Sequence, residues 1–170
     1  MFKVAIRSRG VTIALEIIVL AAIYFIAKAY VQRNLASGTA PEISATLLDR
    51  SPIQLAQYRG KPVLLHFWAT WCSICRLEQS SIQSLSHSYQ VVSVAMQSGE
   101  HQEVQNFMRQ QSLSFPAIAD SNGEISQLYG VTAVPSSFIL DSTGKIMFTE
   151  TGYSSEWGVT VTFMDCRILI

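Results

Sequence analysis

Charged residues and cysteines are both scarce in this sequence. Only 14% of the residues are charged, and twelve basic side chains balance twelve acidic ones, so the chain shows no electrostatic footprint for binding nucleic acid. Three cysteines are too few for a small protein held together by disulfides. Hydrophobic residues make up 49% of the 170 positions, which excludes general disorder and leaves room for one domain of ordinary size.

A long apolar run lies near the N-terminus. Residues 11–31 form a run of 21 residues, if the Lys28 side chain extends to the interface, against the roughly 20 that a helix needs to cross a bilayer. More basic residues precede the run than follow it, so we predict a single transmembrane helix with residues 1–10 in the cytoplasm. Cleavage as a signal peptide after Ala27-Lys28-Ala29 is the alternative, although the run is longer than a usual signal-peptide core.

The segment that follows has a different composition. Residues 32–44 contain Ser, Gly and Pro without helical or alternating periodicity, so we expect a flexible linker. Beyond residue 33 the chain holds seven basic and eleven acidic residues, which gives this outer part a net charge of −4. Residues 45–170 remain to fold as one domain.

The apolar pattern of this domain predicts strands that alternate with helices. Residues 62–68 are an apolar run of strand length, typical of a strand buried on both faces of a sheet. Helical spacing over 73–87 and a second strand at 91–96 complete a β-α-β unit. The pattern then predicts a helix around 104–108, an extended segment at 115–119, a helical turn at 125–130, and strands at 137–140 and 145–150. We therefore expect an α/β fold with a mixed sheet flanked by helices.

The C-terminus does not continue this pattern. Ser154 and Ser155 look like a helix start, but residues 158–163 alternate and are rich in β-branched side chains, so both helix and strand stay open. We interpret residues 158–170 as an atypical C-terminus. It contains the unpaired Cys166, whose thiol is expected to form at most an adventitious bridge between molecules.

The other two cysteines, Cys72 and Cys75, stand at the start of a predicted helix, directly after an apolar strand. A helix N-terminus presents unpaired N–H groups and the positive end of the helix dipole, which lower the pKa of a thiol and favour the nucleophilic thiolate. We expect Cys72, nearest the helix end, to attack a disulfide. Cys75, one turn further along, is placed to resolve the mixed disulfide.

Other uses of a C-x-x-C pair have less support. A zinc site needs two further ligands, and neither Cys166 nor the three histidines are paired at a workable spacing. A structural disulfide across two residues removes little chain entropy and therefore stabilises little. No P-x-x-x-T-x-x-C pattern precedes the pair, which argues against peroxidase activity. We expect redox chemistry and no metal site.

The residues around the pair resemble a known family. The stretch F-W-A-T-W-C-S-I-C-R-L-E at 67–78, together with Val134-Pro135, is similar to the thioredoxin-like disulfide oxidoreductases tethered to the bacterial inner membrane, most closely those of the TlpA and suppressor-of-copper-sensitivity type. The resemblance covers about residues 43–157. It implies a thioredoxin-like fold, a catalytic domain in the periplasm and disulfide exchange with proteins.

The resemblance also implies roles for single residues. Pro135 matches the family's cis-proline, and the backbone of Val134 is expected to pair with substrate. His66 stands where thioredoxin has a buried acid that assists proton transfer to the second cysteine; here it is a proton carrier, a cation that favours the thiolate, or a hydrogen-bonded core residue. Glu78, three residues after Cys75, matches a carboxylate of the TlpA-like group, and a solvated surface glutamate is the alternative.

Three further residues border the pair. Trp71 is expected to shield the cysteines at the rim of the site. Ser73 and Ile74 lie between the cysteines, where we expect them to contact substrate and to affect the reduction potential.

The sequence as a whole predicts a membrane-anchored protein disulfide oxidoreductase with no cofactor beyond its own disulfide. Its expected partners are protein thiols and disulfides, together with a membrane protein that donates or accepts electrons. The direction of exchange depends on the relative stability of thiolate and disulfide, which no residue count fixes. Two alternatives stay open: a copper-handling module that binds Cu(I) through both thiolates, and a redox-inactive adaptor that binds partners through the Pro135 loop.

Overall fold

The chain divides into two units, Met1–Arg33 and Asn34–Ile170. The computed structural model describes residues 2–153. The predicted atypical C-terminus, residues 158–170 with Cys166, lies outside these described residues.

The first unit is one helix, α1 (Phe2–Gln32). Its part Gly10–Gln32 is long and apolar enough to cross a membrane. At 1.5 Å per residue, these 23 residues extend about 35 Å, against about 30 Å of bilayer hydrocarbon. The large apolar side chains from Val11 to Tyr30 are exposed. A signal sequence near the N-terminus can meet the same criteria of length and hydropathy, so this helix is a candidate for either an anchor or a signal.

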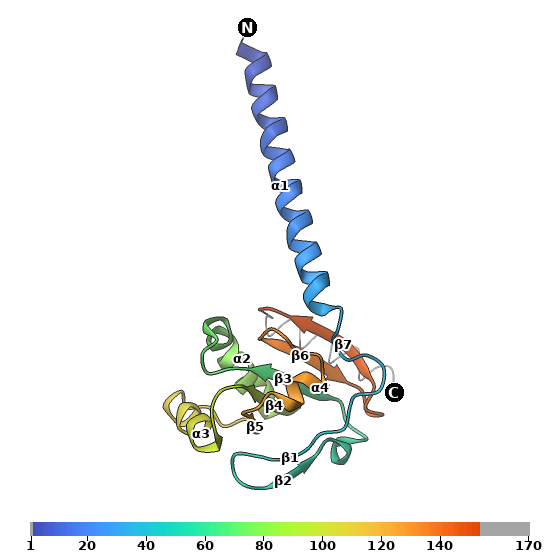
Figure 1. Ribbon diagram of the computed structural model, residues 1–170, viewed down its shortest axis with the longest axis vertical. Coiled ribbons are helices and arrows are strands. Elements are labelled where there is room, and N and C mark those ends of the chain that lie inside the picture. The colour runs from blue at the N-terminus through green and yellow to red at the C-terminus, as the bar shows by residue number, and fades with distance from the viewer. Residues whose placement is uncertain (1, 154–170) are drawn as a thin grey trace. The chain divides into compact units, whose positions relative to one another are not determined.

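The second unit is built on a five-stranded mixed sheet with the strand order β5-β4-β3-β6-β7 (Figure 1). Strands β3, β4 and β5 are parallel, whereas β6 runs antiparallel to both β3 and β7. The bounds are β3 Val63–Trp68, β4 Gln90–Met96, β5 Ala117–Asp120, β6 Ser136–Leu140 and β7 Ile146–Thr151. All six residues of β3 are buried, as expected for the central strand of a sheet that is covered on both faces.

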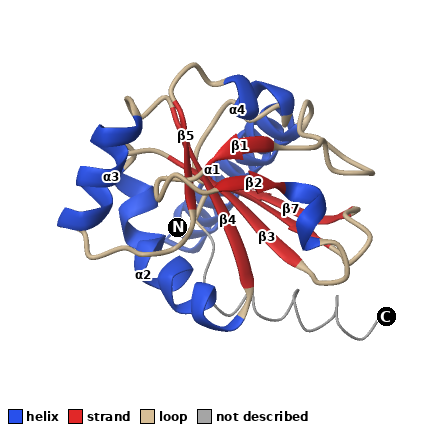
Figure 2. Ribbon diagram, turned by 90° about the horizontal axis from the view of Figure 1, so that it is seen from below, coloured by secondary structure: helices blue, strands red, loops and turns tan. Residues whose placement is uncertain are grey.

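Different elements cover the two faces of this sheet (Figure 2). One core cluster contains side chains of α2 and α3, with Cys72 and Cys75 among its members. The other contains side chains from the segment before β1, from the β1–β2 hairpin, and from the chain just after α4. The helices are α2 Ser73–Ser88, α3 His101–Gln110 and α4 Glu124–Leu128, and the hairpin strands are β1 Ser44–Thr46 and β2 Pro52–Gln54, followed by the short 3-10 helix η1 Leu55–Tyr58.

The α/β fold with a mixed sheet confirms the expectation from the apolar pattern. The predicted strand at 62–68, helix at 73–87 and strand at 91–96 correspond to β3, α2 and β4 within one residue at each end. These elements could be predicted because an apolar residue recurs wherever the helix or strand faces the core. The short β1, β2 and η1 were not predicted, since three or four residues carry no measurable period.

Most of the segment expected to be a flexible linker is fixed to the domain. The Ala36 N–H donates to the Tyr129 carbonyl over 2.9 Å, and the Ala40 N–H donates to the Gly144 carbonyl over 2.9 Å. Ile43 is buried in the core. These hydrogen bonds join the segment to several separate elements. The segment therefore has no helical or alternating periodicity in the sequence, although its backbone is fixed by hydrogen bonds.

Candidate redox site

Cys72 and Cys75 form a disulfide at the start of α2. Cys72 is the N-cap residue, with extended backbone, and its sulfur accepts a hydrogen bond from the Cys75 N–H over 3.1 Å. No acidic residue lies in the first turn of the helix, so nothing there opposes the positive end of the helix dipole. Cys72 is 6% exposed and Cys75 only 1%. The less buried sulfur is therefore the one predicted to attack.

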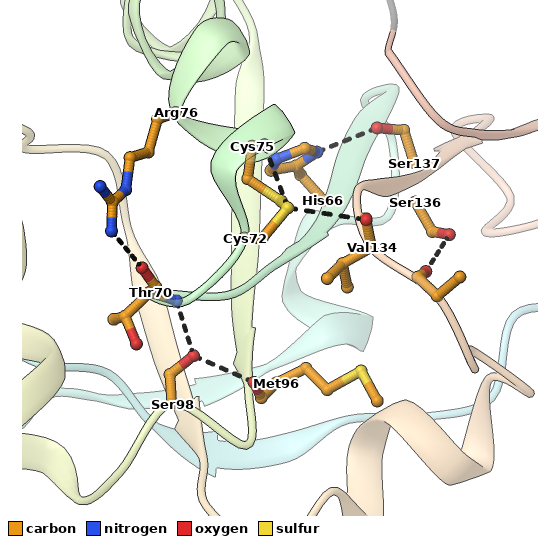
Figure 3. The surroundings of a disulfide bond; sticks show 11 residues. His66, Thr70, Cys72, Cys75, Arg76, Met96, Ser98, Val134, Ser136 and Ser137 are labelled. Atoms are coloured by element: carbon orange, nitrogen blue, oxygen red, sulfur yellow. Dashed lines mark hydrogen bonds between the residues drawn. A yellow bond between two sulfur atoms is a disulfide. The ribbon is translucent and has the colours of Figure 1, made fainter.

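The loop before β6 lies against the first of these sulfurs. The Val134-Pro135 peptide bond is cis. The Val134 carbonyl oxygen lies 3.6 Å from the Cys72 sulfur (Figure 3). A disulfide sulfur carries no proton, so this contact becomes a hydrogen bond only when Cys72 is a thiol that donates to the carbonyl. Ser136 closes the loop, because its hydroxyl donates to the Ala133 carbonyl over 2.8 Å.

His66 lies in β3 and is almost completely buried. Its Nδ1 is 3.0 Å from the hydroxyl of Ser137, its neighbour on β6. Burial lowers the pKa of His66 from 6.5 to about 4, because the charged ring loses solvation. Near neutral pH the imidazole is therefore uncharged. Of the three roles considered for His66, the cation that would favour a thiolate does not apply, whereas a neutral ring can still accept a proton.

Glu78 is also buried, at 2% exposed, on the same helix as the cysteines. The alternative of a solvated surface glutamate is therefore wrong. The position three residues after Cys75 brings both side chains to the same side of α2. Apolar residues at 74 and 77 are exposed instead, so the amphipathic pattern of the helix is inverted around this carboxylate. A buried acid beside a buried cysteine is suited to exchange a proton with it.

The outer surface beside Cys72 is apolar. Trp71 is 60% exposed and its indole N–H donates to the Gln97 carbonyl over 3.1 Å, so the ring is held in place while its face stays open. Ser73 and Ile74 are exposed on the first turn of α2, followed by Leu77. These exposed side chains form the surface next to Cys72.

Three residues near the pair were missed from the sequence: Thr70, Arg76 and Ser98. The Thr70 N–H donates to the Ser98 hydroxyl and joins the loop before α2 to the turn after β4, and Arg76 on α2 donates to the Thr70 carbonyl (Figure 3). Ser98 is 28 residues from Thr70, and a single serine in a turn carries no signal of such a contact. Among the residues that the structure describes, no three His, Cys, Asp or Glu side chains are grouped to hold a metal ion.

A mixed sheet, a disulfide at the start of the helix that follows its central strand, and a proline loop against that disulfide define a thioredoxin-like domain. A family model described as the AhpC/TSA family matches residues 37–149. The chain belongs to this family.

Relatives and solved structures agree with this assignment. The thiol-disulfide oxidoreductase ResA of Bacillus thuringiensis subsp. konkukian is 38% identical over 112 residues, which cover 64% of this chain and 65% of the relative. A thioredoxin-like protein of Haemophilus influenzae is 38% identical over 104 residues, which cover 61% of this chain and 62% of that protein. The chain thus spans less than two thirds of the length of these relatives.

Two crystal structures show the same fold. The exposed lipoprotein thioredoxin Etrx1 of Streptococcus pneumoniae is 26% identical, with a TM-score of 0.64 over 74% of this chain and 99% of that chain. StoA of Bacillus subtilis is 25% identical, with a TM-score of 0.62 over 73% of this chain and 96% of that chain. The match therefore includes nearly the whole of both structures.

Proposed function

We propose that this protein is a thiol-disulfide oxidoreductase that exchanges disulfides with other proteins through Cys72 and Cys75. One observation carries the proposal: the two cysteines form a disulfide at the N-terminus of α2, with Cys72 as N-cap and its sulfur facing the Val134 carbonyl. The similarity to ResA supports the same chemistry.

The reducing half of the exchange takes two steps. The Cys72 thiolate attacks one sulfur of a partner disulfide, forms a mixed disulfide and releases the partner's other sulfur as a thiolate. The Cys75 thiolate then attacks the Cys72 sulfur, forms the intramolecular disulfide and releases the partner's second thiolate. Two electrons pass to the partner, and protons from the two enzyme thiols balance the charge. The same steps in reverse oxidise a dithiol partner.

Buried acid–base groups serve the second step. Cys75 is buried, so its thiol needs a nearby acceptor for its proton before it can attack. Glu78 shares a side of α2 with it, and neutral His66 alternates along β3 with Leu64 and Trp68, which pack in the same core cluster as Cys75. We assign both side chains to proton transfer at Cys75.

The partner binds over the exposed side chains around Cys72. Trp71, Ser73 and Ile74 provide this surface, and the Val134 backbone lies at its edge next to the Cys72 sulfur. Trp71 needs no reordering on binding, since its indole is already hydrogen bonded.

The helix α1 supports a position outside the cytoplasm, anchored in the bacterial inner membrane with the catalytic domain in the periplasm. The basic residues that precede the apolar run favour this orientation. A relative of known structure is an exposed lipoprotein thioredoxin. In this setting a membrane protein supplies or removes the electrons of the Cys72–Cys75 pair.

The proposal is tested by trapping. In Cys75→Ala, expressed as the full chain in membranes, the mixed disulfide on Cys72 is not resolved, so partner proteins accumulate on it and are released by a reductant. The matched control, Cys72→Ala with Cys75→Ala, traps none. The proposal fails if nothing is trapped although Cys72 is alkylated readily. Retention of Cu(I) by the wild-type chain would then favour copper handling, and unchanged cellular function of Cys72→Ser would favour an adaptor.

A further inference from the structure

The loop that leads from β3 into α2 is held by the turn that follows β4 (Figure 3). The Ser98 hydroxyl accepts a hydrogen bond from the Thr70 backbone N–H over 3.0 Å. The same hydroxyl donates to the Met96 carbonyl oxygen, also over 3.0 Å. Its one proton is therefore used, together with one of its two lone pairs. Ser98 is only 7% exposed, so water has little access to replace either bond.

Two further hydrogen bonds hold the loop. The Arg76 Nη2 donates to the Thr70 carbonyl over 3.1 Å, so side chains bind both backbone polar groups of Thr70. The Trp71 indole N–H donates to the Gln97 carbonyl over 3.1 Å. Gln97 has a φ of 44°, in the left-handed region that non-glycine residues rarely adopt. The turn thus keeps an unfavourable backbone conformation while its groups bind the loop.

The position of Cys72 depends on this loop, because Cys72 follows Thr70 by only two residues. Its sulfur lies 3.1 Å from the Cys75 backbone nitrogen and 3.6 Å from the Val134 carbonyl oxygen. Donation from the N–H groups of a helix N-terminus stabilises a thiolate only when the sulfur stays in the N-cap position. A shift of the loop would weaken that stabilisation without removing any group that reacts.

We propose that Ser98 is a positioning residue: by fixing the Thr70 peptide it holds Cys72 at the N-terminus of α2 in the geometry for attack. This inference rests on the proposed thiol-disulfide exchange and adds to it a residue that acts through the loop. It also gives the turn after β4 a function, since its contacts reach the redox pair through Thr70 and Trp71.

The test compares variants of the full chain in detergent. The dithiol form of Ser98→Ala is alkylated with iodoacetamide across a range of pH, and its disulfide is equilibrated with glutathione. We expect alkylation of Cys72 at neutral pH to slow about threefold to tenfold, the range expected for one lost hydrogen bond. The pKa of the Cys72 thiol rises, and the equilibrium with glutathione shifts. Ser98→Thr keeps the hydroxyl and restores values close to those of the wild type.

Ser121→Ala is the matched control. The Ser121 hydroxyl, in the turn after β5, donates to the Gly99 carbonyl over 2.9 Å, so this variant removes a hydroxyl that holds the turn after β4 without touching Thr70. It should leave the alkylation profile and the glutathione equilibrium unchanged. Equal effects of Ser121→Ala and Ser98→Ala would show that only the stability of the turn matters, and the proposal would be wrong. Wild-type behaviour of Ser98→Ala would overturn it as well.

A second variant covers the case in which Ser98→Ala does not fold. Trp71→Phe keeps an exposed aromatic ring and removes only the N–H that binds the Gln97 carbonyl. A smaller shift in the same direction supports the positioning role, and an unchanged profile contradicts it. Exchange of the wild-type disulfide with glutathione tests the proposed function separately, so failure of the positioning role is distinguishable from failure of the redox role.

Discussion

At the scale of single residues, the site separates exposed side chains from buried ionisable ones. Trp71 and Ile74 are exposed beside Cys72, whereas His66, Glu78 and Cys75 are buried. This separation follows from position on β3 and α2, since one side of the helix faces the sheet. Burial then decides charge: an imidazole that cannot be solvated stays neutral near pH 7.

The buried histidine predicts a specific dependence of stability on pH. Its pKa is about 4 in the folded protein and 6.5 when exposed, so between these values the unfolded chain binds more protons. The free energy of unfolding therefore falls as the pH drops from 6.5 towards 4, and the contribution of His66 to that fall is about 3 kcal/mol. Urea unfolding of wild type and His66→Asn at several pH values measures it: the variant should lose less stability in this range.

The control for this experiment is His87→Asn, since His87 lies on the exposed side of α2. This variant should keep the wild-type dependence on pH. If His66→Asn and the wild type lost stability in parallel between pH 6.5 and 4, His66 would not be neutral in the folded protein.

Glu78 leads to a kinetic prediction. Glu78→Gln keeps the shape of the side chain but removes its ability to take the Cys75 proton. A positioned acid–base group contributes about 100-fold or more to proton transfer, so we expect resolution of the mixed disulfide to slow at least about tenfold. First attack by Cys72 should change less. Stopped-flow measurement of both steps separates them, with the exposed Glu124→Gln as control; equal rates in Glu78→Gln and wild type would remove Glu78 from the mechanism.

At the scale of elements, the sequence predicted the strands and helices in which apolar residues recur at regular spacing. It missed the segments that are held by hydrogen bonds to residues far away in the sequence. The strand β3 and the helix α2 were readable because apolar residues recur along them, and the resemblance placed Cys72 and Pro135. The turn around Ser98 and the segment from Ala36 to Ile43 were not, because their order comes from hydrogen bonds to residues far away in sequence. Such contacts leave no local pattern.

The fixed segment before β1 gives a prediction for one glycine. Gly130 has a φ of 67°, and an added Cβ would collide with the backbone carbonyl of Asn34. Gly130→Ala should therefore destabilise the domain and weaken the contacts that hold the segment from Ala36 to Ile43. Gly60→Ala is the control, because its φ is 91° but its Cβ would meet open space, leaving a cost of about 1 kcal/mol for the backbone alone.

Chemical denaturation and limited proteolysis measure both effects. Gly130→Ala should lose more stability than Gly60→Ala, by about 1 kcal/mol or more, and should be cut faster near Ala36. Equal losses in the two variants would mean that Asn34 moves away easily and that the segment is not held at this point.

At the scale of the whole molecule, composition alone separated the two units. The first 33 residues contain five basic residues and one acidic residue, and the remainder carries a net charge of −4. The boundary between the units follows Arg33, two residues beyond the predicted end of the apolar run. Composition separates the units because a long apolar run differs from the mixed composition of a folded domain. The choice between anchor and signal depends instead on whether a protease cleaves the chain after the run.

That choice is decided by the fate of α1 in cells. A chain anchored by its apolar helix is not shortened by cleavage behind that helix and stays in the membrane fraction after an alkaline carbonate wash. Cys72, reduced beforehand, is then labelled in intact spheroplasts by a maleimide that cannot cross the membrane. Replacing Lys3, Arg7 and Arg9 by Gln removes the charge bias and should reduce that labelling, because orientation follows the basic residues. A shorter, soluble species cleaved after Ala29 would show instead that the helix is a signal. The catalytic domain would then act free of the membrane.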